Sequence, residues 1–281
     1  MEIIRSIKQM QQLMKQFRSE GNTIGYVPTM GFLHEGHLTL VNEARKNNDK
    51  VVMSIFVNPL QFGPNEDFDL YPRDFARDEQ LANKAGVDVI FYPDVKEMYP
   101  KELSVTVKVK DRVNVLCGKS RKGHFDGVAT VLMKLFNIVT PDRAYFGMKD
   151  AQQVAVVDGL IHDYNFPIEL VPVPTVREAD GLAKSSRNVY LSNKERNEAP
   201  ELYKSLQKAV QKLNANERDL GKIKNGIQAH IEEKTSGIVD YVEIYSYPQL
   251  LPLMEPKGKM IIAIAVKFSK ARLIDNITIE I

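Results

Sequence analysis

Residues 51–57 form an almost uninterrupted apolar run, VVMSIFV, which restricts the fold more than any other segment of the chain. A strand that is apolar at nearly every position is buried on both faces, as in a parallel sheet covered by helices on either side. Parallel strands need long crossover connections, which are usually helical. The chain around this run fits that requirement, because helical and strand-like patterns alternate through its first two thirds.

The neighbouring segments extend the alternation in both directions. Further strands are expected at residues 24–28, 87–92, 144–146 and 168–173. Helices are expected where apolar side chains recur at helical spacing, over residues 7–17 (ended by Gly21), from about 35 to 46, over 75–85 and over 128–139. The pattern predicts an α/β fold with a doubly wound, Rossmann-like parallel sheet, in which ligands bind beyond the carboxyl ends of the strands.

The last third of the chain has a different pattern. Two charged helical stretches, 193–213 and 219–234, precede strand-like runs at 239–245, 260–268 and 272–281. Helices followed by hairpin-like strands predict a smaller α+β domain. We therefore expect two domains, 1–175 and 176–281, divided after the proline-containing segment VPVP at 171–174.

Composition excludes several classes of protein. The 281 residues include 38 basic and 36 acidic side chains, and the net charge of +2 is interspersed along the chain, so no nucleic-acid partner is expected. A single cysteine, Cys117, excludes an intrachain disulfide and a cysteine zinc cluster. No apolar run has the length of a signal-peptide core or of a membrane span, and we expect a cytoplasmic protein without a membrane partner.

Residues 30–37, MGFLHEGH, lie where the strand at 24–28 gives way to a helix. The two glycines allow a polyphosphate to approach the backbone, and the N–H groups at a helix N-terminus attract phosphate. His34 and His37 are expected to project on one side of the first helical turn. As imidazolium donors they would stabilise negative charge growing on phosphoryl oxygens.

Metal ligation and a purely structural role are the other interpretations of this histidine pair. Two imidazoles are too few for a metal site, and no Asp or Cys lies at a suitable nearby spacing. A pair of histidines at a helix start also occurs without any functional role.

Two later segments carry further groups suited to a nucleotide. In FGMKDAQQ at 146–153, Lys149 is placed to meet a phosphate and Asp150 to accept hydrogen bonds from a ribose, with a helix N-cap as the alternative role for Asp150. In GLAKSSRN at 181–188, two serines lie between Lys184 and Arg187, which suits a triphosphate, although such loops are often only solvent-exposed turns. Together with residues 30–37, these segments predict a polyphosphate site.

Two other segments are candidates for a second substrate pocket. Gln61 follows the buried strand and offers amide donors and acceptors to the cleft. Residues 121–127, RKGHFDG, place a cation beside an aromatic ring before the apolar helix. For His124 and Asp126, a helix-start capping network is the favoured interpretation.

The combination of these segments resembles the pantothenate synthetase (pantoate–β-alanine ligase) family. The matching segments, in the family's order and spacing, are PTMGFLHEGH at 28–37, FVNPLQFGPNEDFDLYPR at 56–73, RKGHFDGV at 121–128, FGMKDAQQ at 146–153 and GLAKSSRN at 181–188. The first and last are similar to the HIGH and KMSKS motifs of class I aminoacyl-tRNA synthetases, and the middle three point to this family in particular. Many members carry methionine where this chain has Lys184.

The resemblance implies a ligase that uses ATP with Mg²⁺ as co-substrate. The carboxylate of (R)-pantoate would attack the α-phosphorus of ATP, giving pantoyl adenylate and pyrophosphate, and β-alanine would then displace AMP to form pantothenate. The resemblance also implies a homodimer without a prosthetic group. Mg²⁺ would lie on phosphate oxygens rather than in a protein metal site.

Position by position, the resemblance assigns roles to the matched residues. His34, His37, Lys149 and Arg187 would be catalytic, with His37 as a proton donor. The ATP site would comprise Met30, Gly31, Phe32, Leu33, His34, Glu35, Gly36, His37, Gly147, Met148, Lys149, Asp150, Val176, Lys184, Ser185, Ser186 and Arg187. Gln61 and Gln153 would hold pantoate, and Gln61 would also face β-alanine.

Two alternative functions remain. Another nucleotidyltransferase of the same superfamily would explain the histidine and serine segments but not the context of Gln61 and Gln153. A nucleotide sensor or RNA-binding module is disfavoured by the near-neutral charge. For the ligase, the polar loop at 63–73 is predicted to close over bound substrates.

Overall fold

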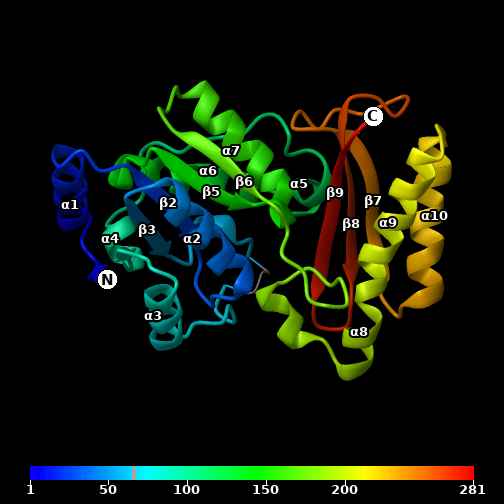
Figure 1. Ribbon diagram of the computed structural model, residues 1–281, viewed down its shortest axis with the longest axis horizontal. Helices are drawn as coiled ribbons and strands as arrows, with labels where there is room; N and C mark the ends of the chain where they lie inside the picture. The colour runs from blue at the N-terminus through cyan, green and yellow to red at the C-terminus, as the bar shows by residue number, and fades with distance from the viewer. Residues whose placement is uncertain (65–67) are drawn as a thin grey trace.

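The chain contains a parallel sheet in its first part and an antiparallel sheet in its last part (Figure 1). A computed structural model describes residues 1–64 and 68–281, and within these residues the first sheet has six strands in the order β1-β4-β3-β2-β5-β6. The strands are β1 (Glu2–Ile4), β2 (Ile24–Thr29), β3 (Lys50–Ile55), β4 (Val89–Phe91), β5 (Arg143–Gly147) and β6 (Glu169–Val173). The strand order reverses between β2 and β5, so the carboxyl ends of these two strands frame the crevice where such sheets bind ligands.

Helices cover both faces of this sheet because successive strand residues point to opposite faces. Tyr26 and Val52 pack with α1 (Ile7–Ser19), α6 (His124–Val139) and α7 (Ala151–Asp163) on one face. Val27 and Met53 pack with α2 (Glu35–Asn47) and α3 (Phe75–Lys84) on the other. The doubly wound fold predicted from the apolar run at 51–57 is therefore confirmed.

The second sheet is antiparallel, in the order β7-β8-β9, and α9 and α10 cover one of its faces (Figure 1). Its strands are β7 (Ile238–Ser246), β8 (Lys259–Lys267) and β9 (Arg272–Glu280). The helices are α8 (Asn193–Glu198), α9 (Pro200–Asn214) and α10 (Leu220–Lys234). The single helix expected at 193–213 is thus two helices, and the second begins at Pro200, whose ring supplies no backbone N–H to the preceding turn. On the other face, Ile261 and Ala263 pack against Ala151 and Ala155 of α7.

Several short elements were not predicted, because three to five residues are too few to show a periodic pattern. They are β1, α4 (Val95–Met98), α5 (Leu116–Ser120) and the 3-10 turns η1 (Pro59–Gln61), η2 (Met148–Asp150) and η3 (Ser186–Tyr190). Three residues of the loop predicted to close, 65–67, lie outside the described residues. In the part of the chain that is described, no helix is both long enough and apolar enough to cross a membrane.

Candidate active site

Two adjoining cavities lie at the carboxyl ends of β2 and β5. The smaller, of about 250 Å³, is lined by residues from all the predicted segments: Met30, His34, Gly36, His37, Gln61, Gly147, Lys149, Asp150, Gln153, Val176, Lys184, Ser185, Ser186 and Arg187. The larger, of about 780 Å³, extends toward the second sheet and shares Lys149, Asp150, Gln153, Ser185 and Arg187 with the smaller one. Groups distant in the sequence therefore converge on one cleft, as the rule for parallel sheets predicts.

The two histidines form a reciprocal cap at the start of α2. His34 is the N-cap residue rather than part of the first turn, and its Nδ1 accepts the N–H of Gly36 at 3.1 Å. His37 Nδ1 accepts the N–H of His34 at 3.2 Å, and the ring centroids are 4.1 Å apart. Because both Nδ1 atoms accept hydrogen bonds, each neutral ring carries its proton on Nε2. The Nε2–H groups are then the donors that these rings offer to the cavity.

Enclosure by the protein keeps both imidazoles uncharged. Burial, reinforced by the positive charge of Lys149, lowers the pKa of His34 to about 4. Burial and the adjacent His34 lower the pKa of His37 to about 3. The prediction that these residues act as imidazolium donors is therefore wrong for the unliganded protein at neutral pH. Two neutral N–H donors face the cavity instead.

The lowered pKa values link stability to pH. In the unfolded chain, a histidine takes up its proton as the pH falls through about 6.5. In the folded protein, His34 does so only near pH 4 and His37 only near pH 3, so between these values the unfolded chain binds more protons than the folded one. Stability is therefore lost as the pH falls through this window, by at most roughly 1.4 kcal/mol per pH unit for each histidine. Urea unfolding measured from about pH 7 to 5 should show a shallower decline for a His34→Gln, His37→Gln double variant. Equal slopes in the two proteins would contradict this linkage.

The backbone between β2 and α2 is held by a buried carboxylate that was not predicted. Asp78 of α3, only 1% exposed, accepts the N–H groups of Phe32 and Leu33, each at 2.7 Å. Gly31 has φ +84°, and a Cβ there would lie 3.0 Å from Asp78 Oδ2. Gly31 is thus required by this turn and its carboxylate. The position of Asp78, one helical turn after Phe75 on the apolar face of α3, was the available signal.

The prediction that backbone N–H groups at this helix start bind phosphate is therefore wrong for the amides of Phe32, Leu33, His34 and Gly36. Each of them already donates to Asp78 or to a histidine ring. The glycine at 36 also makes room for a ring rather than for phosphate, because a Cβ there would lie 2.8 Å from His34 Cε1.

Lys149 lies on η2, immediately after the carboxyl end of β5, and lines both cavities. Its Nζ is 3.8 Å from Asp150 Oδ1. Asp150 occupies the N-cap position of α7, as the alternative interpretation placed it, but within the described chain its side chain accepts no N–H of that helix. Gln153 lines both cavities, whereas its buried neighbour Gln152 lines the larger one and donates to the carbonyls of Arg112 and Val115, each at 2.8 Å.

The serine-rich loop faces α2 across the smaller cavity. Lys184 Nζ lies 3.0 Å from Glu35 Oε2, which joins the loop to the first residue of α2. Ser185 Oγ accepts the N–H of Arg187 at 3.3 Å and begins η3. The loop is therefore both an ordered turn and a wall of the cavity, with Lys184 and Arg187 among its lining residues.

Gln61 is held in the lining of the smaller cavity by contacts with Asn58, Met30 and His124. Its Oε1 accepts from Asn58 Nδ2 at 3.2 Å, its Nε2 lies 3.1 Å from Met30 Sδ, and its carbonyl oxygen is 2.7 Å from His124 Nδ1. Gly127 permits this packing, because a Cβ there would lie 2.1 Å from the carbonyl oxygen of Leu60. His124 and Arg121 line the cavity as well. The capping interpretation of His124 did not predict its contact with Gln61.

Some predicted residues have structural contacts instead of cavity positions. Among the described residues, the lining of the two cavities does not include Gly31, Phe32, Leu33, Glu35 or Met148. Asp126 accepts the N–H of Val109 at 2.8 Å. Residues 1–64 and 68–281 contain no group of three or more His, Cys, Asp or Glu side chains that could hold a metal ion.

Comparison with known proteins decides the family. Residues 2–278 match the model of the pantoate–β-alanine ligase family. The chain belongs to the pantoate–β-alanine ligase family. A pantothenate synthetase of Geobacillus kaustophilus (strain HTA426) is 64% identical over 100% of this chain and 94% of its own length. That of Bacillus subtilis (strain 168) is 63% identical over 100% and 98%.

Solved structures of ligases from this family have the same fold. The crystal structure of pantothenate synthetase from Thermus thermophilus matches with a TM-score of 0.93 and 43% identity, covering 99% of each chain. Pantoate–β-alanine ligase from Francisella tularensis, complexed with βγ-ATP and β-alanine, matches with a TM-score of 0.80 and 34% identity over 99% of this chain and 97% of its own. The resemblance found in the sequence motifs is thereby confirmed across the whole chain.

Proposed function

We propose that this chain condenses pantoate with β-alanine at the expense of ATP, through a pantoyl adenylate, and releases AMP and pyrophosphate. The observation that carries this proposal is the convergence on one cavity of Lys149, Lys184 and Arg187 with Gln61 and Gln153. The cations suit a triphosphate, and the amides suit the hydroxyls of a small acid. The Francisella tularensis relative, solved with a form of ATP and β-alanine, supports the same substrates here.

In the first step, a pantoate carboxylate oxygen attacks the α-phosphorus, and the bond from that phosphorus to the bridging oxygen of pyrophosphate breaks. Lys149 and Arg187 neutralise the phosphates, and the Nε2–H groups of His34 and His37 donate to phosphoryl oxygens as their charge grows. Asp150 and Gly147 contact the ribose, and the backbone of Met30 and Val176 borders the nucleotide. Lys184, Ser185 and Ser186 complete the phosphate wall.

In the second step, the β-alanine amine attacks the pantoyl carbonyl carbon, the bond to the AMP oxygen breaks so that AMP leaves, and the amine loses a proton to water as the amide forms. Gln61 and Gln153 hold pantoate throughout, and Gln61 also faces the incoming amine. No side chain needs to form a covalent intermediate. The enzyme then acts mainly by positioning the reactants and stabilising charge.

Magnesium enters as part of the nucleotide substrate. The cavity walls supply lysine, arginine, imidazole and amide groups, and the Asp150 carboxylate lies beside Lys149. Mg²⁺ prefers oxygen ligands and commonly binds through substrate phosphates and water. These groups fit a Mg²⁺ ion that is bound by the phosphate oxygens of ATP rather than by protein side chains.

We also infer the wider organisation of the enzyme. Residues 1–175 hold ATP and pantoate, and residues 176–281 carry the serine-rich phosphate loop, in line with the end of β6 at Val173 and the separate core of the second sheet. The active form is a homodimer in the cytoplasm, where ATP is available, with neither nucleic acid nor membrane as a partner. Light scattering should give about twice the chain mass of 31.9 kDa.

One assay tests the proposed reaction. The protein is incubated with Mg-ATP, labelled pyrophosphate and pantoate, without β-alanine. We expect pantoate-dependent exchange of label into ATP, followed by stoichiometric AMP and pantothenate when β-alanine is added. No exchange from folded protein would overturn the proposed adenylate route, and exchange without pantoate would indicate a different acceptor.

Substitutions of Lys184 and of its partner Glu35 are expected to change the KM for ATP in opposite directions. If Lys184 contacts phosphate, Lys184→Met should raise the KM for ATP by about threefold to tenfold, in line with the loss of one charge-assisted hydrogen bond. Glu35→Gln should lower this KM, because it frees the ammonium from its 3.0 Å partner. Both effects should shrink at high salt. Equal KM values in the two variants would place Lys184 outside phosphate contact.

A further inference from the structure

Two consecutive polar residues, Asp275 and Asn276, are buried in the middle of β9, at 4% and 8% exposure. Neighbouring strand residues point to opposite faces, so these side chains reach different partners. Asp275 lies on the face of Leu273, which packs with α9 and α10. Asn276 is paired in register with Ala263, whose face packs against α7. Buried polar groups are retained only with hydrogen-bond partners, and the partners here lie on both halves of the phosphate site.

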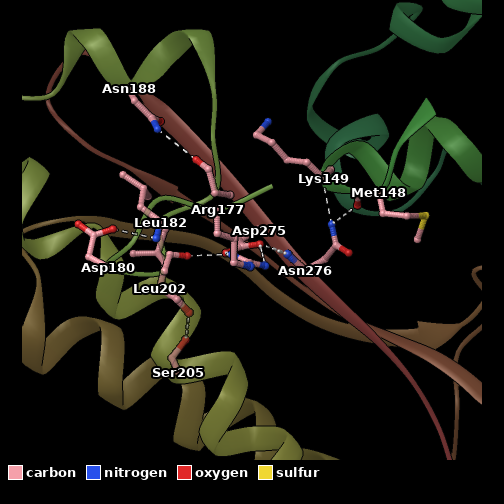
Figure 2. A network of polar contacts seen from close by, with 12 residues as sticks. Met148, Lys149, Arg177, Asp180, Leu182, Asn188, Leu202, Ser205, Asp275 and Asn276 are labelled. Atoms are coloured by element: carbon pink, nitrogen blue, oxygen red, sulfur yellow. Dashed lines mark hydrogen bonds and ion pairs between the residues drawn. The ribbon is translucent and has the colours of Figure 1, made fainter. Parts of the chain in front are cut away.

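Asn276 holds the turn that carries Lys149 (Figure 2). Its Nδ2 donates to the carbonyl oxygens of Met148 and Lys149, each at 3.0 Å. An amide nitrogen has two N–H groups, so one side chain satisfies two consecutive carbonyls and restrains the peptide plane between them. The backbone that carries the Lys149 side chain is therefore held in place by the second sheet.

Asp275 holds the start of the serine-rich loop (Figure 2). Its carboxylate accepts from both terminal nitrogens of Arg177, at 2.7 and 2.9 Å. Arg177 also donates to the carbonyl of Gly181 at 3.1 Å, and its guanidinium carbon lies 3.5 Å from the ring centroid of Tyr203. A bidentate, stacked arginine has a fixed orientation. Residues 177–183, which lead directly into Lys184 and Ser185, are thereby tied to β9.

We propose that Asp275 and Asn276 are positioning residues that set the spacing between the two cationic halves of the phosphate site. This inference rests on the proposed function. Lys149 lies on η2 and Arg187 on η3, and adjacent residues of β9 anchor the two segments that carry them. Because charge stabilisation depends on geometry fixed before the reaction, displacing either segment lowers kcat even when both cations remain.

The test compares Asn276→Ala with a matched control. Asn48 is also 8% exposed, and its Nδ2 also donates to two groups, the Ala44 carbonyl and the Tyr145 hydroxyl. It precedes β3 and, among the described residues, is not itself in the lining of either cavity, whereas Tyr145 lines the smaller one. We expect Asn276→Ala to lower kcat for pyrophosphate exchange by about tenfold to a hundredfold, with the KM for pantoate changed less than twofold. Asn48→Ala should lower the melting temperature without lowering kcat. Equal kcat losses in the two variants would reflect general destabilisation and overturn the inference.

A double-mutant cycle with Lys149→Ala makes the test specific. If Asn276 acts through Lys149, Asn276→Ala should lower kcat less than twofold in the Lys149→Ala background. Losses that multiply independently would overturn the positioning role. Failure of the proposed function would show separately, as absent exchange in the unmodified protein. In that case, calorimetric titration with Mg-ATP tests the inference. Asn276→Ala should raise the Kd for Mg-ATP, and an unchanged Kd would overturn the inference.

Discussion

Replacing Lys149 with alanine is expected to lower the rate of pantoate-dependent ATP–pyrophosphate exchange by about 10²–10³-fold. The side chain is 20% exposed, lines both cavities, and leaves a turn at the carboxyl end of β5. There its ammonium can neutralise charge on the phosphates as the bond to pyrophosphate breaks. Arginine at this position keeps the charge but has a different shape, so Lys149→Arg should recover only part of the rate.

Lys224→Ala is the control for this prediction. Lys224 lies on α10, where its Nζ pairs with Glu243 at 2.8 Å, and it lines neither cavity among the described residues. Its loss should leave exchange unchanged. Circular dichroism and melting temperature establish that both variants fold. Exchange by Lys149→Ala within about fivefold of the unmodified rate, a loss below 1 kcal/mol, would show that another group makes the phosphate contact.

The fold could be predicted wherever an element is long enough to show its burial pattern. The run at 51–57 indicated a strand buried on both faces, and the helices on both sides of the first sheet confirm this. The 3-10 turn η1 is different, because contacts distant in the sequence support it. Asn58 Nδ2 donates to the carbonyl of Gly127 in α6 at 3.1 Å, and the absence of a Cβ at Gly127 lets that helix approach the backbone of η1. No local pattern contains such information.

The side chains that form the site could be predicted from the sequence, but the protonation states of its histidines and the hydrogen bonds that orient its side chains could not. Parallel strands gather their carboxyl ends, so His37, Lys149 and Gln61 were expected to converge. Which of Gln152 and Gln153 lines the smaller cavity depends on the carbonyls of Arg112 and Val115, which only the folded chain brings near. Likewise, the neutral state of the histidines arises from burial, which the motif does not encode.

His37 offers the second large effect, because its two ring nitrogens have separate roles. Nδ1 accepts the N–H of His34, and Nε2–H is the donor available to a phosphoryl oxygen. Asparagine places its amide near the Nδ1 position, and glutamine places its amide near Nε2. We therefore expect His37→Asn to lower the exchange rate by about 10²–10³-fold and His37→Gln by only about tenfold. The reverse order would indicate that His37 acts mainly by supporting the cap.

The pH profile of the unmodified enzyme tests the same assignment independently. The profile of kcat/KM for ATP reports groups of the free enzyme, where the pKa of His37 is about 3 and that of His34 about 4. Neither ring should then produce a change in this profile between about pH 5.5 and 8, and exposed His162 replaced by Asn should behave like the unmodified enzyme. A limb centred near pH 6.5 that disappears in His37→Gln would show that an imidazolium, rather than a neutral Nε2–H donor, takes part in binding ATP.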